Sequence, residues 1–178
     1  MANEIDEQLN DKVLAVLTAK SVATCLKVGG TQSWALDPYH AKRCRFAVLC
    51  RNLHADWGDG LEPHRTAFMI GRISGVEPST EGSEGRWLVK FEEYAIVDIP
   101  EAWKGWRNPV RYTTFNELGI TRKELEAADF KEMPTREPER LTASAAQPNG
   151  KMTIAEAKTA LAENYGVKPE CIEITIRG

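Results

Sequence analysis

The tryptophans are the side chains of this sequence best suited to hold a ligand. Trp57, Trp103 and Trp106 lie beside Gly, Pro, Arg or Lys, in segments expected to be loops. Tryptophan is normally buried over most of its surface, so an indole in a loop needs a partner. Three partners stay open: a stacked base, worth roughly 1–3 kcal/mol, a second protein, or the end of a sheet beneath the loop. Trp34, in a short expected strand, fits either the core or a pocket wall.

Arginine and asparagine supply a second set of candidate contacts. The dipeptide Arg-Asn occurs twice, as Arg51-Asn52 and as Arg107-Asn108. Arginine offers a planar fork for phosphate, and asparagine offers both donors and an acceptor for a base edge. A local backbone role competes for Asn108, because it precedes Pro109 and this step favours a turn. The residues predicted to contact nucleic acid are Trp34, Arg51, Asn52, Trp57, His64, Arg65, Trp103, Trp106, Arg107 and Arg111.

No catalytic or metal-binding signature stands out. One glycine-rich loop carries His54, Asp56, Asp59 and His64, but their spacing matches no familiar ligand set. A serine triad, a Walker loop and a dinucleotide glycine pattern are all missing from the sequence. The four cysteines form no C-x-x-C pair, and buried reduced thiols are expected. We therefore predict no cofactor and no metal, and binding is favoured over catalysis.

Composition describes a soluble globular chain. Its 178 residues suit one domain and a small appendage, with 42% apolar and 28% charged residues. The net charge of −3 argues against a general nucleic-acid coat but leaves room for a local basic face. The acidic N-terminus lacks the order of a signal peptide, and no apolar run approaches the ~20 residues of a membrane span. A cytoplasmic protein without a membrane partner is expected.

The first half of the chain predicts a mixture of helices and short strands. Apolar residues between Ile5 and Leu26 recur at helical spacing, so a helix is expected within domain 1–30. Asp37 before Pro38 signals the start of a short helix. The strand RFAVLC follows, and a long loop leads to two extended strands, TAFMIGRISGV and RWLVKFEEYAIVDI. Gly71 or Gly75 is expected to permit a bend or bulge.

The second half predicts a short strand, two helices and a separate unit. The segment PVRY leads into a helical turn that Gly119 ends, and Thr121 with Glu124 has the spacing of a capping box. Prolines and charges indicate a linker at 130–150. Beyond it, 151–178 reads as a helix and a strand, which cannot bury a core alone.

Three segments in succession resemble the PUA-like superfamily, especially its YTH and EVE branches. They are HRTAFMIGRISGV, GRWLVKFEEYAIVDIP and RNPVRYTTFNELGI, and the resemblance covers roughly Trp34 to Ile120. It implies an α+β fold: a small mixed β-barrel over 31–129, with flanking helices and a C-terminal helix–strand appendage. It also implies a pocket at the barrel mouth in which aromatic side chains hold a single, often modified, base. The glycine–lysine–glutamate–arginine pattern of the hydrolytic ASCH branch is absent.

Three functions stay open on this basis. Non-catalytic recognition of RNA or DNA, including a modified base, is the first. A protein-binding module or inhibitor is the second, motivated by the net acidity and the C-terminal unit. An ASCH-type nucleoside hydrolase is the third.

Overall fold

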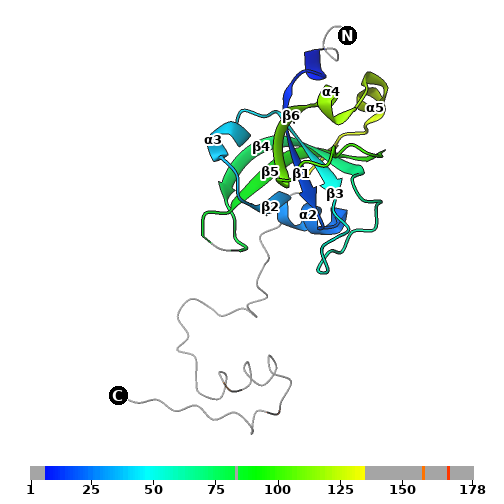
Figure 1. Cartoon of the computed structure of the whole chain (residues 1–178). Coiled ribbons are helices and arrows are strands. Elements are labelled where there is room, and N and C mark those ends of the chain that lie inside the picture. Colours follow the sequence, from blue (N-terminus) through cyan, green and yellow to red (C-terminus); the bar gives the residue numbers. More distant parts are fainter. Residues whose placement is uncertain (1–6, 83, 135–157, 159–167, 169–178) are drawn as a thin grey trace. The chain divides into compact units, whose positions relative to one another are not determined.

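The computed structural model describes residues 7–82, 84–134, 158 and 168 (Figure 1). The chain divides into two compact units, Met1–Arg136 and Glu137–Gly178. All the helices and strands described below belong to the first unit. The predicted helix–strand unit at 151–178 and most of the predicted linker lie outside the described residues, so both remain predictions.

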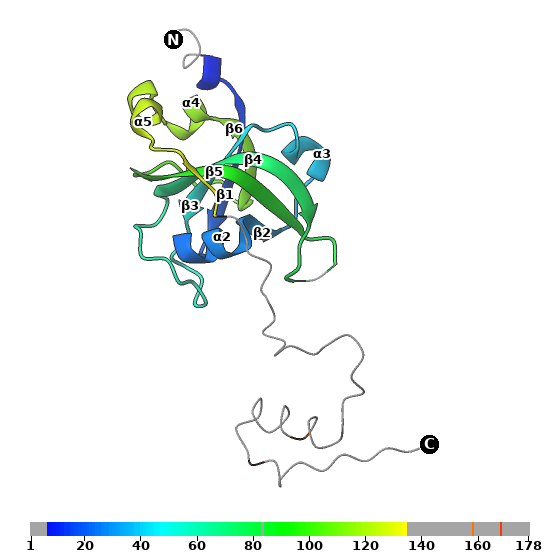
Figure 2. The ribbon, with the colours of Figure 1, turned by 180° about the vertical axis from the view of Figure 1, so that it is seen from behind.

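The first unit is built on one mixed sheet that curls into a half-barrel (Figures 1 and 2). Along the sheet the strands run in the order β2-β5-β4-β3-β1-β6. β1 and β3 pair in parallel, and the other neighbours pair antiparallel. These strands are β1 (Lys12–Thr18), β2 (Gly30–Trp34), β3 (Phe46–Arg51), β4 (Ala67–Pro78), β5 (Trp87–Ile99) and β6 (Val110–Thr114). The predicted α+β class, with a barrel-like sheet and flanking helices, is confirmed.

Four short helices flank the sheet, and local capping signals place them. They are α2 (Val22–Val28), α3 (Pro38–Ala41), α4 (Phe115–Leu118) and α5 (Arg122–Ala127). The Asp37 carboxylate accepts the Tyr39 N–H at 2.8 Å, which starts α3 as predicted. Gly119 ends α4 at a φ of 77°. The predicted capping box of Thr121 and Glu124 opens α5.

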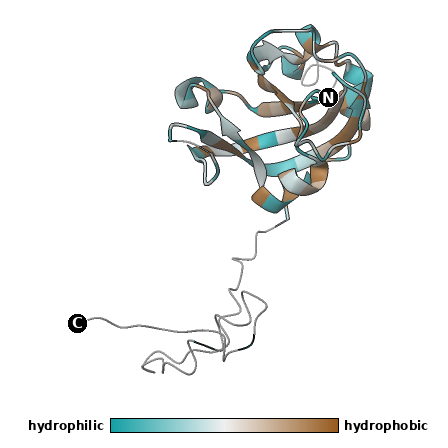
Figure 3. Cartoon of the chain, turned by 60° about the horizontal axis from the view of Figure 1, so that its bottom comes forward, coloured by the Kyte–Doolittle hydropathy of each residue, from teal (hydrophilic) through white to brown (hydrophobic). Residues whose placement is uncertain are grey.

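The central strands are buried on both faces, because each face carries its own apolar cluster. Val13 and Ala15 of β1 belong to one cluster, and Leu14 and Val16 belong to the other. The first cluster lies under α4, α5 and the loop after β5, while the second lies under α2 and α3. Hydropathy colouring shows apolar stretches along the strands with polar residues between them (Figure 3).

The predicted N-terminal helix is wrong. Residues 12–18 form the central strand β1, which separates a helical stretch at 7–8 from α2, whose N-cap is Ser21. The apolar spacing that suggested a helix also fits a strand whose two faces are both buried. Four consecutive residues of β1, from Val13 to Val16, are fully buried, which accounts for the misassignment.

The long hairpin of β4 and β5 bends where glycines were expected to allow it. Its register shifts on both sides of Ile73, next to Gly75. At Gly71 a Cβ would overlap the ring of Phe91, so only glycine fits there. The first described residues of the predicted linker belong to the sheet instead, because β7 (Lys131–Glu132) pairs with β5.

Candidate nucleic-acid interface

Most of the predicted contact residues lie at one end of the sheet. β1 and β3 end there, and β4 and β6 begin there. The loop 52–65 and the segment 100–109 meet at this end, where the Trp103 N–H donates to the carbonyl of Arg65 at 3.1 Å. We call this the loop end. Those gathered there are Arg51, Asn52, Trp57, His64, Arg65, Trp103, Trp106 and Arg107, with Arg111 just inside β6.

Trp34 lies at the opposite end. It pairs with Trp87 at the start of β5, and its indole N–H donates to the Thr31 hydroxyl at 2.8 Å. The half-buried ring packs on one of the two core clusters. The structure therefore separates Trp34 from the other predicted contacts.

Arg51 is an internal anchor, which corrects its predicted role in phosphate contact. Its side chain is 0% exposed, and its Nε donates to the Glu62 carboxylate at 2.8 Å. Nη1 donates to the carbonyl of Lys20 at 2.8 Å, and the guanidinium lies 4.1 Å from the centroid of the Phe68 ring. A Cβ on Gly60 would overlap the guanidinium. The loop is thus closed over a buried charge, which needs its carboxylate partner.

Trp103 is a core residue, which corrects its prediction as a binding residue. Its side chain is 2% exposed and belongs to the cluster beneath α4 and α5. Trp106 packs edge-on against it, with ring centroids 5.0 Å apart. Trp106 itself is only half-buried, and the Arg111 guanidinium lies 5.4 Å from its ring centroid. Of the two indoles, Trp106 is the one that a ligand can reach.

The loop 52–65 is fixed from within but exposes its own indole. Trp57 is 69% exposed. Nearby, the Asp59 carboxylate accepts the hydroxyls of Ser21 at 2.6 Å and of Thr24 at 2.8 Å. These hydrogen bonds, with Ser21 first, lower the pKa of Asp59. Asp59 is therefore a structural cap for the start of α2.

Other polar side chains of the loop 52–65 also make contacts that hold the loop in place. The Asn52 carboxamide oxygen accepts the His54 N–H at 3.0 Å. The rings of His54 and His64 pack edge-on, 4.3 Å apart, and burial is the first cause of the lowered pKa of His64. Arg65 forms an ion pair with Glu101 at 3.6 Å. These contacts hold the loop together and leave the rims of His64 and Arg65 accessible.

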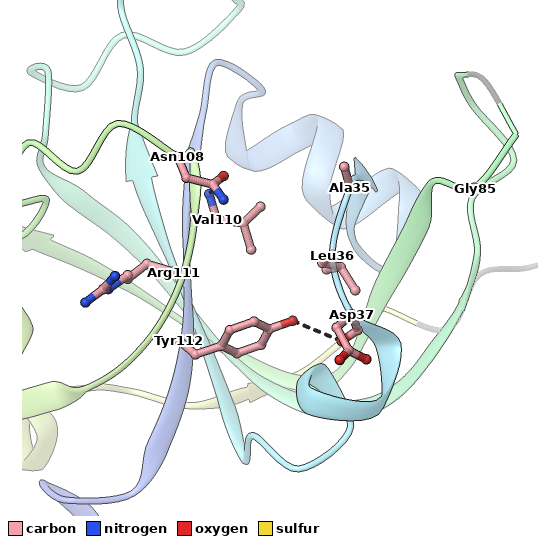
Figure 4. Close-up of a pocket in the computed structure, with 8 residues that line it drawn as sticks. All are labelled: Ala35, Leu36, Asp37, Gly85, Asn108, Val110, Arg111 and Tyr112. Carbon is pink, nitrogen blue, oxygen red and sulfur yellow. Dashed lines mark hydrogen bonds between the residues drawn. The ribbon is translucent and has the colours of Figure 1, made fainter.

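A cleft lies where the half-barrel stays open, between β6 and the segment that follows β2. We call it the seam cleft. Its volume is about 640 Å³. Ala35, Leu36, Asp37 and Gly85 line one side, and Asn108, Val110, Arg111 and Tyr112 line the other (Figure 4). The Tyr112 hydroxyl donates to the carbonyl of Asp37 at 2.9 Å and so bridges the gap. No tryptophan of the described residues lines this cleft.

β6 is an edge strand, and its free side faces the seam cleft. The carbonyl of Pro109 accepts the Leu17 N–H at 2.8 Å and therefore points toward β1. Because backbone groups alternate along a strand, those of Val110 and Tyr112 point to the open side. The Asn108 carboxamide oxygen accepts the Val110 N–H at 3.1 Å, which confirms its local backbone role. Its amide nitrogen remains a donor at the rim of the cleft.

Side chains leave β6 on both faces. Tyr112 points toward the seam, and Arg111 points the other way, over Trp106 (Figure 4). A ligand lying along this edge can therefore meet the Arg111–Trp106 pair and the seam cleft together. Sequence reasoning missed Tyr112 and Asp37, because nothing local indicates that two segments so far apart meet.

The surface cations are paired unevenly. Many form ion pairs with carboxylates, among them Lys20, Arg45, Arg72 and Lys90. No carboxylate within the described part of the chain pairs with Lys12, Lys42, Arg43, Arg107 or Arg111. These five lie in or next to the clefts along β6. These five thus follow the open edge of the sheet, while other cations without a carboxylate partner among the described residues, such as Lys27 and Lys123, lie outside the lining of both clefts.

Metal and thiol chemistry find no support in the described residues. Among them, no cluster of His, Cys, Asp and Glu could hold a metal ion. Cys25, Cys44 and Cys50 are free and buried. Burial raises the pKa of Cys25 and of Cys50 to about 12, so neither thiol is a nucleophile near neutral pH. The described part also contains no helix long and apolar enough to cross a bilayer.

Comparison with known proteins adds no relative. Neither a protein-family model, nor a curated protein, nor a solved structure matches this chain. The half-barrel architecture stands on its own geometry, and the PUA-like resemblance remains a prediction.

Proposed function

We propose that this protein binds nucleic acid without catalysis, through the open edge of its half-barrel at β6. The observation that carries the proposal is the line of unpaired cations along that edge, within the described part of the chain. Arg107 and Arg111 lie at one end of β6, and Lys12 and Arg43 lie at the other. Such a line of cations favours the binding of a polyanionic strand, because each phosphate that a cation neutralises releases counterions and so raises the affinity.

The edge also offers the contacts that bases need. The exposed rim of Trp106, held by Trp103 behind it and by Arg111 beside it, is a stacking platform. The seam cleft has apolar walls at Leu36 and Val110, and polar groups at its rims. Its volume of about 640 Å³ leaves room for one base, with or without a small modification. In this proposal the cleft, rather than a cage of tryptophans, selects the base.

Fluorescence anisotropy tests the proposal with the full chain and labelled 12-mers of RNA and DNA, unmodified and carrying a methylated base. The double variant Arg107→Gln/Arg111→Gln is expected to bind more weakly and with a shallower salt dependence. Lys27→Gln/Lys123→Gln is the matched control, because neither lysine pairs with a carboxylate of the described residues and neither lines the seam cleft. The proposal fails if none of the 12-mers binds wild-type protein at 50 mM salt.

One observation favours a second candidate, a docking site for another protein. The loop 52–65 exposes three large apolar side chains while its interior is fixed by Arg51 and Asp59. These are Leu53, Trp57 and Leu61, exposed by 50%, 69% and 94%. A loop that presents an exposed indole offers one of the side chains most enriched in hot spots, and the two leucines extend the apolar surface around it. A single stoichiometric protein partner that is lost with Trp57→Ala and kept after nuclease treatment supports this function.

A further inference from the structure

A second cleft continues the seam cleft toward the other end of β6. The two clefts share Tyr112, and the second has a volume of about 410 Å³. His40 and Arg43 line it from α3 and the turn after it. Thr113 and Thr114 line it from the end of β6, and Lys12 lies beside them at the start of β1. We call it the α3 cleft.

The charge lining the α3 cleft is positive. Lys12 and Arg43 both lie on its wall, and no carboxylate of the described residues pairs with either. The carboxylate of Glu117 is the acidic group of the lining. The Glu117 carboxylate accepts a hydrogen bond from the Thr113 hydroxyl, and the backbone N–H of Glu117 donates to the Thr114 hydroxyl. Glu117 is thus held at the wall of the cleft, and the two cations outnumber it.

The neighbouring acids are already occupied. Asp37 accepts the Nδ1 of His40 at 2.8 Å, and Asp11 accepts Arg45 at 3.0 Å. The imidazole of His40 is therefore held in place through its Nδ1. Neither of these two acids supplies a counter-ion for Lys12 or Arg43.

Two backbone carbonyls next to the α3 cleft already accept hydrogen bonds. The carbonyl of His40 accepts the Arg43 N–H at 3.1 Å, and the Cys44 thiol donates to the same oxygen at 3.6 Å. The carbonyl of Ala41 accepts the Cys44 N–H at 3.1 Å. Two cations without a carboxylate partner among the described residues, beside carbonyls that already accept hydrogen bonds, favour an anion over a cation.

We propose that the α3 cleft is a phosphate-binding subsite, held by Lys12 and Arg43. It takes the phosphodiester next to the base in the seam cleft, and this assignment rests on the proposed function of β6. Arg43 supplies a planar fork and Lys12 a compact charge, which together suit a tetrahedral oxyanion. A bound strand then runs along β6 from the loop end to α3.

Two measurements test the subsite with the full chain. In the first, anisotropy with a labelled 12-mer compares wild type with Lys12→Gln/Arg43→Gln between 50 and 200 mM salt. The double variant is expected to bind at least about tenfold more weakly at 50 mM salt. The slope of log affinity against log salt falls by roughly 0.7 for every phosphate of a single strand that the variant no longer neutralises. Lys27→Gln/Lys123→Gln is the charge-matched control, since neither lysine lines the α3 cleft or the seam cleft.

In the second, ¹H–¹⁵N NMR follows a titration with inorganic phosphate against sodium chloride of matched ionic strength. Phosphate is expected to shift the amides of Cys44, Thr113 and Thr114 in wild type but not in the double variant. The affinities of 12-mers with and without a 5′-phosphate are then compared. Equal affinities indicate that the subsite binds an internal phosphodiester, and a higher affinity of the 5′-phosphorylated 12-mer indicates that it binds a terminal phosphate.

The outcomes separate the two proposals. If the 12-mer binds wild type and the double variant with equal affinity and slope, the subsite is overturned and the proposed function stands. Phosphate that moves no amide of the α3 cleft overturns the subsite as well. If no 12-mer binds wild type, the proposed function falls and the phosphodiester assignment falls with it.

Discussion

The guanidinium of Arg111 lies 5.4 Å from the centroid of the Trp106 ring, on the face of β6 that points away from the seam cleft. Trp103 supports the same indole from behind, at a centroid distance of 5.0 Å. In the proposed function this pair is the stacking platform, and its two components come from a loop and from an edge strand. A base that stacks on it gains contact with a ring and with a cation at once.

Removing the indole is therefore expected to weaken binding more than folding. A stacked base contributes roughly 1–3 kcal/mol, so Trp106→Ala should lower the affinity for a labelled 12-mer by about 5- to 150-fold. Trp106→Phe keeps a ring and should recover most of the affinity. Equal affinity of wild type and Trp106→Ala in anisotropy would remove Trp106 from the interface.

The pair of Arg51 and Glu62 is expected to stabilise the loop end. Glu62→Ala leaves a fully buried guanidinium without its carboxylate, which should lower the free energy of unfolding by about 3 kcal/mol. Glu101→Ala removes the partner of the exposed Arg65 and should cost less than about 1 kcal/mol. Urea unfolding followed by fluorescence measures both. Equal losses in the two variants would contradict the internal role of Arg51.

Sequence signals that act within one helical turn predicted several elements of this fold. One element that depends on pairing between distant segments was predicted wrongly. Asp37 before Pro38, Gly119, and Thr121 with Glu124 act within one turn, so their helices could be predicted from the sequence. The segment 12–18 could not, since its apolar spacing fits a helix as well as a strand buried on both faces. Only its pairing between β3 and β6 decides between them.

The same distinction applies to the candidate site. Loop position singled out Trp57 and Trp103 alike, although Trp57 is exposed and Trp103 is buried, and it could not reveal that Arg51 lies beneath the loop. That depends on Glu62, eleven residues away, and on the missing Cβ of Gly60. The seam cleft joins Asp37 to Tyr112, which are 75 residues apart. Its existence follows from the curl of the sheet, which no short pattern encodes.

Trp103 is expected to act on stability. Truncating a buried side chain of this size typically costs about 3–5 kcal/mol, so Trp103→Ala should lower the free energy of unfolding by about that much. Trp57→Ala, at an exposed position, should change it by less than about 0.5 kcal/mol. Thermal and urea unfolding compare the two. A stable Trp103→Ala variant would show that the ring is not part of the core.

Asp59 is expected to make the loop sensitive to acid. Hydrogen bonds from the Ser21 and Thr24 hydroxyls lower its pKa from the ordinary 3.8. A group whose pKa is lowered by folding stabilises the protein above its unfolded pKa, and this is lost as the pH falls through the folded pKa. The stability gap between wild type and Asp59→Asn should thus be constant near neutral pH and shrink below about pH 4. Urea unfolding at a series of pH values measures it, and a gap that widens in acid would contradict the cap.

The buried thiols are expected to be inert in the folded first unit. Burial raises the pKa of Cys25 and of Cys50 to about 12 and that of Cys44 to about 11. At pH 8 the reactive thiolate is therefore scarce, in addition to being shielded from solvent. A Cys171→Ser variant removes the thiol outside the described residues, so a disulfide reagent such as DTNB then reports on these three alone. Little reaction is expected at pH 8 without denaturant and full reaction in 6 M guanidinium. Rapid native-state reaction of any of the three would show that the strands and helices around it open readily.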